Sequence, residues 1–121
     1  MKKIRVTILD DHQSIIDGYL FRLQHHPDIE VVATALYAED VEEILAECRP
    51  DILILDVTVP TSKENQNPYP IIQAISKWRQ MYPGLSILVI SMHNLRTMAK
   101  AVLDAGASGY ILKETELRSK I

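Results

Sequence analysis

The sequence predicts a doubly wound α/β domain: a five-stranded parallel sheet with helices on both faces and the strands in the order 2-1-3-4-5. Two observations predict this fold. Five short β-rich apolar runs alternate with four stretches that carry apolar residues at helical spacing, a pattern typical of parallel strands joined by right-handed helical crossovers. The first, third and fourth runs look buried on both faces, so we expect these strands to be central.

The composition is that of one globular domain. The chain has 121 residues, of which 47% are hydrophobic and 24% charged. A net charge of −3 argues against nucleic-acid binding by this domain itself, because contact with phosphates needs a basic surface. The single cysteine, Cys48, excludes an internal disulfide and fits a reducing cytoplasm. No apolar run approaches the ~20 residues that span a membrane, so we predict a cytoplasmic protein.

The first half of the chain is expected to form strand, helix, strand and helix at residues 4–9, 13–26, 29–36 and 39–48. The two strands are the β-rich runs IRVTIL and IEVVATAL. The first helix has apolar residues at helical spacing from Ile15 to Leu23, and Pro27 stops it. The second helix is amphipathic and is closed by Pro50.

The second half is expected to form strand, loop, helix, strand, helix and strand at residues 52–56, 61–70, 71–82, 85–91, 94–105 and 108–112. The continuous apolar runs ILIL and LSILVIS predict the third and fourth strands. The loop TSKENQNPYP is polar and contains two prolines. Pro83-Gly84 ends the third helix, and Gly106 ends the fourth. A truncated fifth helix is expected from Glu114 to the end of the sequence.

Acidic side chains follow two strands that are neighbours in the predicted order. Asp10 and Asp11 follow the first strand, and Asp56 ends the third. Because ligands bind at the carboxyl ends of the strands in open α/β sheets, we expect the three carboxylates to converge in one crevice. Carboxylates held together without a counterion repel one another, and a hard divalent cation relieves the repulsion. An open site with water ligands favours Mg²⁺.

Two further polar residues are expected at the same edge of the sheet. Ser91 ends the fourth strand, and Lys113 follows the fifth. A hydroxyl, a flexible ammonium and Mg²⁺ together would bind the oxygens of a phosphoryl group, with Asp56 as the nucleophile. The residues therefore suggest a site that forms an aspartyl phosphate.

In these residues the chain resembles the receiver domain of two-component response regulators. The matching features are Asp10-Asp11, Asp56 with Pro60 four residues later, Ser91, and Lys113 followed by an acid. The segments DDH, RPDILILD, ISMH and AGASGYILKE look most like the LuxR/NarL-type subfamily, whose receivers precede a helix-turn-helix. The resemblance covers essentially the whole chain. It implies the flavodoxin-like, CheY-like fold predicted above.

The resemblance also implies roles for the residues at the acidic edge. Asp56 would be the phosphorylation site, Asp11 a direct metal ligand, and Asp10 an acid that holds metal-bound water. The main-chain carbonyl of Thr58 would complete the metal site, whose ion would be Mg²⁺.

Other residues would sense the phosphoryl group or set its lifetime. Ser91 and Lys113 would contact the phosphate, and Tyr110 matches the aromatic switch residue that changes rotamer when Ser91 moves. Thr58 and His93 occupy positions that tune dephosphorylation in the resembled family.

The family further implies partners. A sensor histidine kinase would donate the phosphoryl group, and helix 4, strand 5 and helix 5 would pass the signal to an effector. Residues 1–121 would form the receiver domain alone, and a DNA-binding helix-turn-helix domain would follow in a longer protein. A second copy of the chain is a further expected partner, in a homodimer. Such a domain is not an enzyme beyond catalysing its own phosphorylation and dephosphorylation.

The chain departs from the family pattern beside the acidic site. Val59 stands where the family usually has Met, and no glycine follows Pro60 closely. The polar loop at 61–70 is several residues longer than usual. Because the loop begins beside Asp56, it could alter metal access or the docking of the phosphoryl donor.

These residues have alternative interpretations. Asp10 and Asp11 could merely cap the first helix, and the unusual loop leaves open a degenerate receiver that acts as a phosphorylation-independent interaction module. A haloacid-dehalogenase-type phosphatase would need a second acid where Thr58 stands. A flavodoxin-like nucleotide binder is disfavoured, because Asp10-Asp11 would repel a phosphate placed after the first strand.

Overall fold

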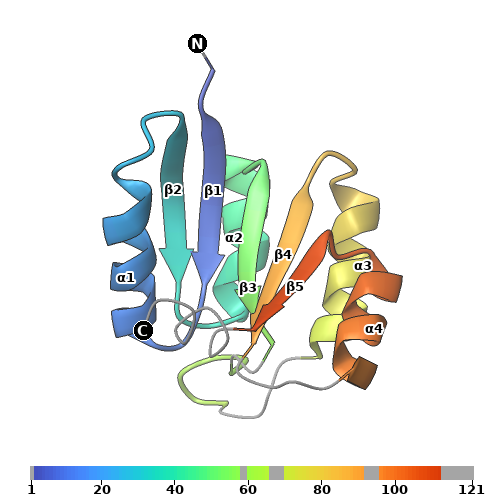
Figure 1. Cartoon of the computed structure of the whole chain (residues 1–121). Helices are drawn as coiled ribbons and strands as arrows, with labels where there is room; N and C mark the ends of the chain where they lie inside the picture. Colours follow the sequence, from blue (N-terminus) through green and yellow to red (C-terminus); the bar gives the residue numbers. More distant parts are fainter. Residues whose placement is uncertain (1, 58–59, 66–69, 92–95, 113–121) are drawn as a thin grey trace.

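The computed structural model describes residues 2–57, 60–65, 70–91 and 96–112 and shows a five-stranded parallel sheet (Figure 1). The strands are β1 (Ile4–Leu9), β2 (Ile29–Ala35), β3 (Ile52–Asp56), β4 (Ser86–Ser91) and β5 (Gly109–Leu112). Their order is β2-β1-β3-β4-β5, and all four neighbouring pairs are parallel. The predicted fold and strand order are confirmed.

Helices cover both faces of the sheet. They are α1 (Gln13–Leu23), α2 (Glu39–Cys48), α3 (Ile71–Met81) and α4 (Arg96–Ala105). On one face, Ile16 of α1 packs against Val6 and Ile8 of β1. On the other face, α2, α3 and α4 share one core cluster with Leu53 and Leu55 of β3. Strand β1 is thereby buried on both sides, whereas Ile52 and Ile54 of β3 and Leu88 of β4 are only partly buried.

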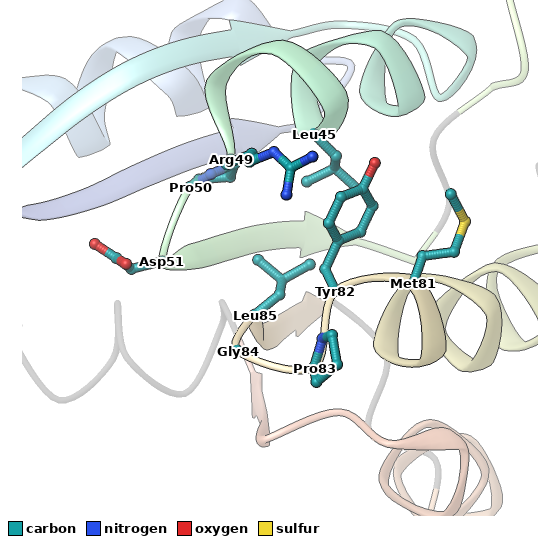
Figure 2. A pocket seen from close by; sticks show the side chains of 9 residues that line it. All are labelled: Leu45, Arg49, Pro50, Asp51, Met81, Tyr82, Pro83, Gly84 and Leu85. Atoms are coloured by element: carbon teal, nitrogen blue, oxygen red, sulfur yellow. The ribbon is translucent and has the colours of Figure 1, made fainter.

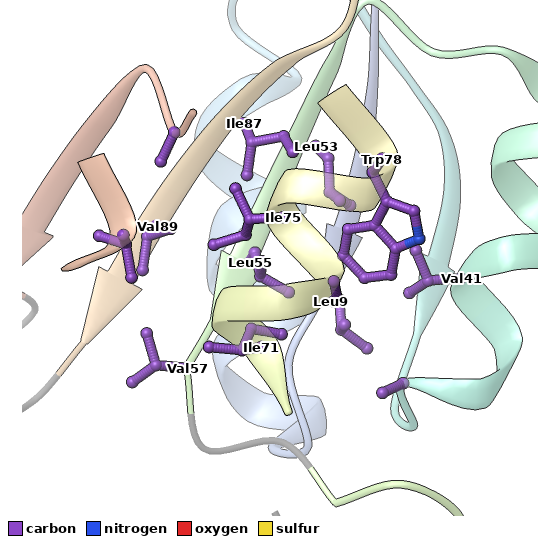
Figure 3. Close-up of a cluster of buried hydrophobic side chains, with 14 of the residues drawn as sticks. Leu9, Val41, Leu53, Leu55, Val57, Ile71, Ile75, Trp78, Ile87 and Val89 are labelled. Atoms are coloured by element: carbon purple, nitrogen blue, oxygen red, sulfur yellow. The ribbon is translucent and has the colours of Figure 1, made fainter. Parts of the chain in front are cut away.

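The larger core cluster is centred on α3 (Figure 3). Trp78 is 1% exposed, and Ile75 beside it is fully buried. The indole of Trp78 lies near Leu9 of β1 and Val41 of α2 in Figure 3. The stripe of apolar residues around Trp78 therefore forms the core between α3 and the sheet.

Helix α1 is shorter than its sequence predicts. The periodicity favours 13–26, whereas the helix ends at Leu23. The reason lies in the hydrogen bonds of the last turn: His25 N–H donates to the carbonyl of Arg22, and His26 N–H to that of Leu23, so the chain tightens into 3₁₀-type bonds. Other element ends shift by one residue where they are described. Residues 94–95 of the expected fourth helix, and the whole of the expected fifth, lie outside the described residues.

A hollow of about 260 Å³ opens at the amino ends of β3 and β4 (Figure 2). Leu45, Arg49, Asp51 and Tyr82 are among its lining residues. The carboxylate of Asp51 accepts the N–H of Arg5 at 2.9 Å and so ties this end of β3 to β1. Because the hollow lies at the edge opposite to Asp56, it takes no part in the site described below.

Within the described part of the chain, no helix is long and apolar enough to cross a membrane.

The turn after α4 requires a glycine. Gly106 has φ of +121°, and its N–H and that of Ala107 donate to the carbonyls of Leu103 and Val102, which is a Schellman motif. A Cβ on Gly106 would lie 2.9 Å from the Cγ of Arg79, too close without a shift of that side chain.

We expect Gly106→Ala to lower the free energy of unfolding by about 1–3 kcal/mol, the usual cost of a strained backbone position. Gly18→Ala is the matched control: Gly18 lies within α1, and its added Cβ meets nothing within 4 Å. That substitution should raise stability by about 0.5–1 kcal/mol. Urea unfolding of both variants measures the difference, and equal stabilities would contradict the assignment of the turn.

Candidate functional site

The three predicted carboxylates converge at the carboxyl edge of the sheet. Strands β1 and β3 pair in parallel with Leu9 opposite Leu55, so the acids that follow these residues emerge side by side. Asp10 is 2% exposed and Asp56 5%, whereas Asp11 faces solvent. One ligand atom from each of Asp10, Asp11, His12 and Asp56 lies within 4.8 Å of the other three. We call these four residues the acidic cluster.

Main-chain hydrogen bonds hold Asp10 in this position. Its N–H donates to the carbonyl of Ala35 at 3.1 Å, which continues the ladder between β1 and β2. Its carboxylate accepts the N–H of His12 at 3.0 Å and closes a tight turn before α1. The N-cap residue of α1 is His12, whose own side chain makes no capping hydrogen bond. The carboxylate of Asp10 therefore orders the turn that leads into the helix.

The donor set of the acidic cluster fits one divalent cation. Three carboxylates supply the oxygen ligands that hard dications prefer, and metal–oxygen distances are about 2.0–2.6 Å. Ligands on opposite sides of such an ion are therefore about 4–5 Å apart, which matches the 4.8 Å span of the cluster. A bound cation would also offset the repulsion between the like charges of the carboxylates.

The structure also brings His12 into the cluster. Its Nδ1 lies 3.1 Å from Oδ1 of Asp11 and 3.3 Å from Oδ1 of Asp10. The imidazole is 64% exposed, so it covers the acids from the solvent side. Its place directly after Asp11 in the sequence predicts this position beside the acids.

The remaining predicted residues lie partly within the described structure. Ser91 is fully buried at the end of β4, one residue beyond Ile90, the partner of Asp56 in the sheet. Tyr110 of β5 pairs with Val89 and is half-buried against the larger core cluster. Thr58, His93 and Lys113 lie outside the described residues, so their roles stay predictions.

The first part of the long loop is fixed to α2. The carbonyl of Pro60 accepts the N–H of Ala38 at 3.0 Å, and that of Thr61 accepts the N–H of Glu39 at 2.9 Å. These bonds satisfy main-chain donors at a helix start that lacks a side-chain cap. Buried Ser62 then accepts the N–H of Asn65 on its hydroxyl at 3.0 Å, which closes a compact turn.

Helix α4 carries the features expected of an exposed surface. Lys100 and Asp104 form an ion pair at 2.8 Å one helical turn apart, and the hydrogen bond and charge of Asp104 raise the pKa of Lys100. Leu103 on the same helix is 46% exposed, and Ile111 on β5 is 37% exposed. These side chains form part of the α4 and β5 surface through which the family resemblance implies that the signal passes to an effector.

Comparison with known proteins is consistent with the site. The family model of the response regulator receiver domain matches residues 6–121. The transcriptional regulatory protein DegU of Brevibacillus brevis is 35% identical over 114 residues, 94% of this chain and 45% of that protein. The chain spans about half the length of the curated relatives that it matches.

Two solved structures are similar throughout the fold. One is the isolated REC domain of RcsB from Salmonella enterica serovar Typhimurium, solved in the presence of the phosphomimetic BeF₃⁻, with a TM-score of 0.80 and 27% identity over 93% of this chain and 79% of that one. The other is a two-component response regulator of the LuxR family from Aurantimonas sp., with a TM-score of 0.78 and 30% identity over 98% of this chain and 81% of that one.

We expect Mg²⁺ to raise the melting temperature, because a bound cation relieves the repulsion within the acidic cluster. Asp10→Asn should raise metal-free stability by about 1 kcal/mol, because it removes one of the repelling charges while the amide oxygen still accepts the His12 N–H. The same variant should abolish the response to Mg²⁺, because it removes a carboxylate from the cluster. Asp28→Asn, at an exposed site outside the cluster, should leave both unchanged. Thermal unfolding with and without Mg²⁺ tests this. A melt that millimolar Mg²⁺ does not shift would count against a metal site.

Proposed function

Since the chain belongs to the family of response regulator receiver domains, we propose that it accepts a phosphoryl group on Asp56. The observation that carries the proposal is the position of this carboxylate. Asp56 ends the central strand β3 and lies within the acidic cluster beside Asp10 and Asp11. Open α/β sheets bind their ligands at this edge, outside the carboxyl ends of neighbouring strands such as β1 and β3.

The proposed reaction is a direct displacement at phosphorus. One carboxylate oxygen of Asp56 attacks the phosphorus atom of a phosphoryl donor, and an oxygen–phosphorus bond forms. The bond from phosphorus to the donor atom breaks, and that atom leaves with the electron pair. The donor that the family implies is a phosphohistidine of a sensor kinase, whose leaving atom is an imidazole nitrogen. Apart from this self-directed reaction and the later hydrolysis of the aspartyl phosphate to Asp56 and inorganic phosphate, we assign no enzymatic activity.

The neighbours of Asp56 have complementary roles in this proposal. Asp10 and Asp11, with the Thr58 carbonyl predicted beside them, would hold Mg²⁺. The ion, when bound, offsets the negative charge of the carboxylates and of the phosphoryl oxygens. Ser91 supports the proposal by its place at the end of β4, where its hydroxyl could donate to a phosphoryl oxygen after a small movement. Lys113 would supply the positive charge, and Thr58 and His93 would tune hydrolysis.

The signal would leave through α4 and β5. Tyr110 lies half-buried on β5, at the border between the core and the exposed side chains of α4 and β5. A change of its rotamer, coupled to Ser91, needs only a few kcal/mol of differential contact between two populated states. We propose that this surface controls a DNA-binding effector domain in a longer cytoplasmic protein, as the transcriptional role named for DegU suggests.

The degenerate-receiver alternative gains no support from the described residues. A module that never binds a metal or phosphate would have no need to keep Asp10, Asp11 and Asp56 together, because their repulsion lowers stability.

Incubation with acetyl phosphate and Mg²⁺ tests the assignment of Asp56. We expect intact-mass spectrometry to show the gain of one phosphoryl group, because the small donor needs no kinase. Asp56→Asn should abolish the gain, since an amide oxygen is a poor nucleophile. Asp104→Asn, on the exposed side of α4, is the matched control and should be modified like the parent. A protein that gains no mass from acetyl phosphate or from a histidine kinase would contradict the proposal.

A further inference from the structure

The hollow at the amino ends of β3 and β4 is not used by the function proposed above (Figure 2). Its volume of about 260 Å³ lies just below the range of about 300–1,000 Å³ that is usual for drug-sized ligands. The hollow therefore suits a smaller molecule. Most of its walls are apolar and come from Leu45, Pro50, Met81, Pro83 and Leu85.

Main-chain hydrogen bonds hold both sides of the hollow in place. At the end of α2, the N–H of Arg49 donates to the carbonyl of Leu45 at 3.2 Å. After α3, the N–H of Tyr82 donates to the carbonyl of Trp78 at 2.8 Å, and the N–H of Leu85 donates to that of Tyr82 at 3.0 Å. Because the walls are already ordered, a ligand would lose little free energy in shaping its own site.

Arg49 brings a positive charge to the hollow that the fold itself does not use. Two other arginines at this edge are bound to carbonyl oxygens. Arg5 donates to the carbonyls of Cys48 and Arg49 at the end of α2. Arg79 donates to the carbonyl of Pro83 at 3.1 Å. The guanidinium of Arg49, by contrast, forms no hydrogen bond or ion pair with another described residue, so its N–H donors are available to a ligand.

The hydroxyl of Tyr82 is a second donor that no other described residue binds. In Figure 2 this hydroxyl and the guanidinium of Arg49 both lie beside Leu45. Asp51 is the acid among the lining residues, but its carboxylate accepts the N–H of Arg5 at 2.9 Å and points away from both donors. The hollow therefore offers a cation and a hydroxyl beside apolar walls.

The main chain of Arg49 adds an independent observation. This residue ends α2 in the left-handed conformation, with φ of +45°. Glycine adopts this conformation freely, whereas any other side chain is disfavoured there. The guanidinium is thus present at a cost in main-chain stability, a situation that is common at binding sites.

We propose that this hollow binds a small molecule in which a carboxylate is attached to an apolar group. A guanidinium fits a carboxylate with two parallel hydrogen bonds, and the Tyr82 hydroxyl donates a third. The apolar group packs against Leu45 and Leu85, which are 1% and 3% exposed. The proposal does not depend on the transfer of a phosphoryl group to Asp56, which lies at the opposite edge of the sheet.

Phenylacetate is the probe for this site, because it combines a carboxylate with an apolar ring. Its binding is followed by the chemical shifts of the main-chain amides in proton–nitrogen NMR spectra. We expect shifts at the lining residues and a Kd of about 1 mM, which is usual for a ligand of this size. Phenylacetamide lacks the charge and acetate lacks the ring, so each should bind about tenfold more weakly.

Variants of the two donors test their roles. Arg49→Gln should weaken the binding of phenylacetate by about tenfold, and Tyr82→Phe by about threefold. Arg22→Gln, on the exposed side of α1, also removes one positive charge and should bind like the parent. Arg49→Gly should lose binding like Arg49→Gln, yet should unfold at a higher urea concentration because glycine relieves the left-handed main chain. Weaker binding in this variant is therefore not a result of weaker folding.

Three outcomes would overturn the inference: shifts spread over unrelated surfaces, equal binding of phenylacetamide, or unchanged affinity in Arg49→Gln. A peptide that ends in a free phenylalanine carries the same chemistry, and its tighter binding would reject a small molecule as the ligand. Phosphorylation with acetyl phosphate is measured separately. Modification at Asp56 without binding of phenylacetate would contradict this inference alone, whereas loss of modification would concern the proposed function.

Discussion

The repulsion among three carboxylates at one edge of the sheet is the constraint around which this domain is built. Adjacent parallel strands deliver their carboxyl ends to the same edge, so the pairing of β1 with β3 brings Asp10 and Asp11 to Asp56. Two of these acids are nearly excluded from water. Hydrogen bonds of the turn orient Asp10 locally, and the packing of the helices on both faces holds the two strands that carry the acids. The free energy stored there is available to a cation or to a reaction that changes the charge.

The two faces of the sheet contribute to this restraint in different ways. The smaller cluster packs α1 against β1, the strand that leads to Asp10 and Asp11. The larger cluster joins α2, α3 and α4 to β3, which leads to Asp56. Leu9 of β1, directly before Asp10, also belongs to the larger cluster, so the core on both faces of the sheet positions Asp10 and Asp11. A cavity in either cluster would disturb the distance between the acids without touching them.

The sequence was sufficient for the fold and for most of the cluster because burial and topology leave strong patterns. The run ILIL before Asp56 is typical of a buried strand, and the alternation of strands with helices determines which strand ends meet. Hydrogen bonds among neighbouring main-chain groups leave weaker patterns in the sequence. The tightened last turn of α1 depends on such bonds, so periodicity could not reveal it. Nor does composition show that the carbonyls of Pro60 and Thr61 bind the start of α2.

The attachment of Pro60 and Thr61 to α2 has a consequence for how this domain can diverge. The stem of the loop is fixed by main-chain atoms, which any sequence supplies, and Ser62 and Asn65 close it off. Residues gained or lost beyond Asn65 would therefore not pull on the end of β3. The number of residues in the loop beyond Asn65 can therefore change while Asp56 stays in register with its neighbours.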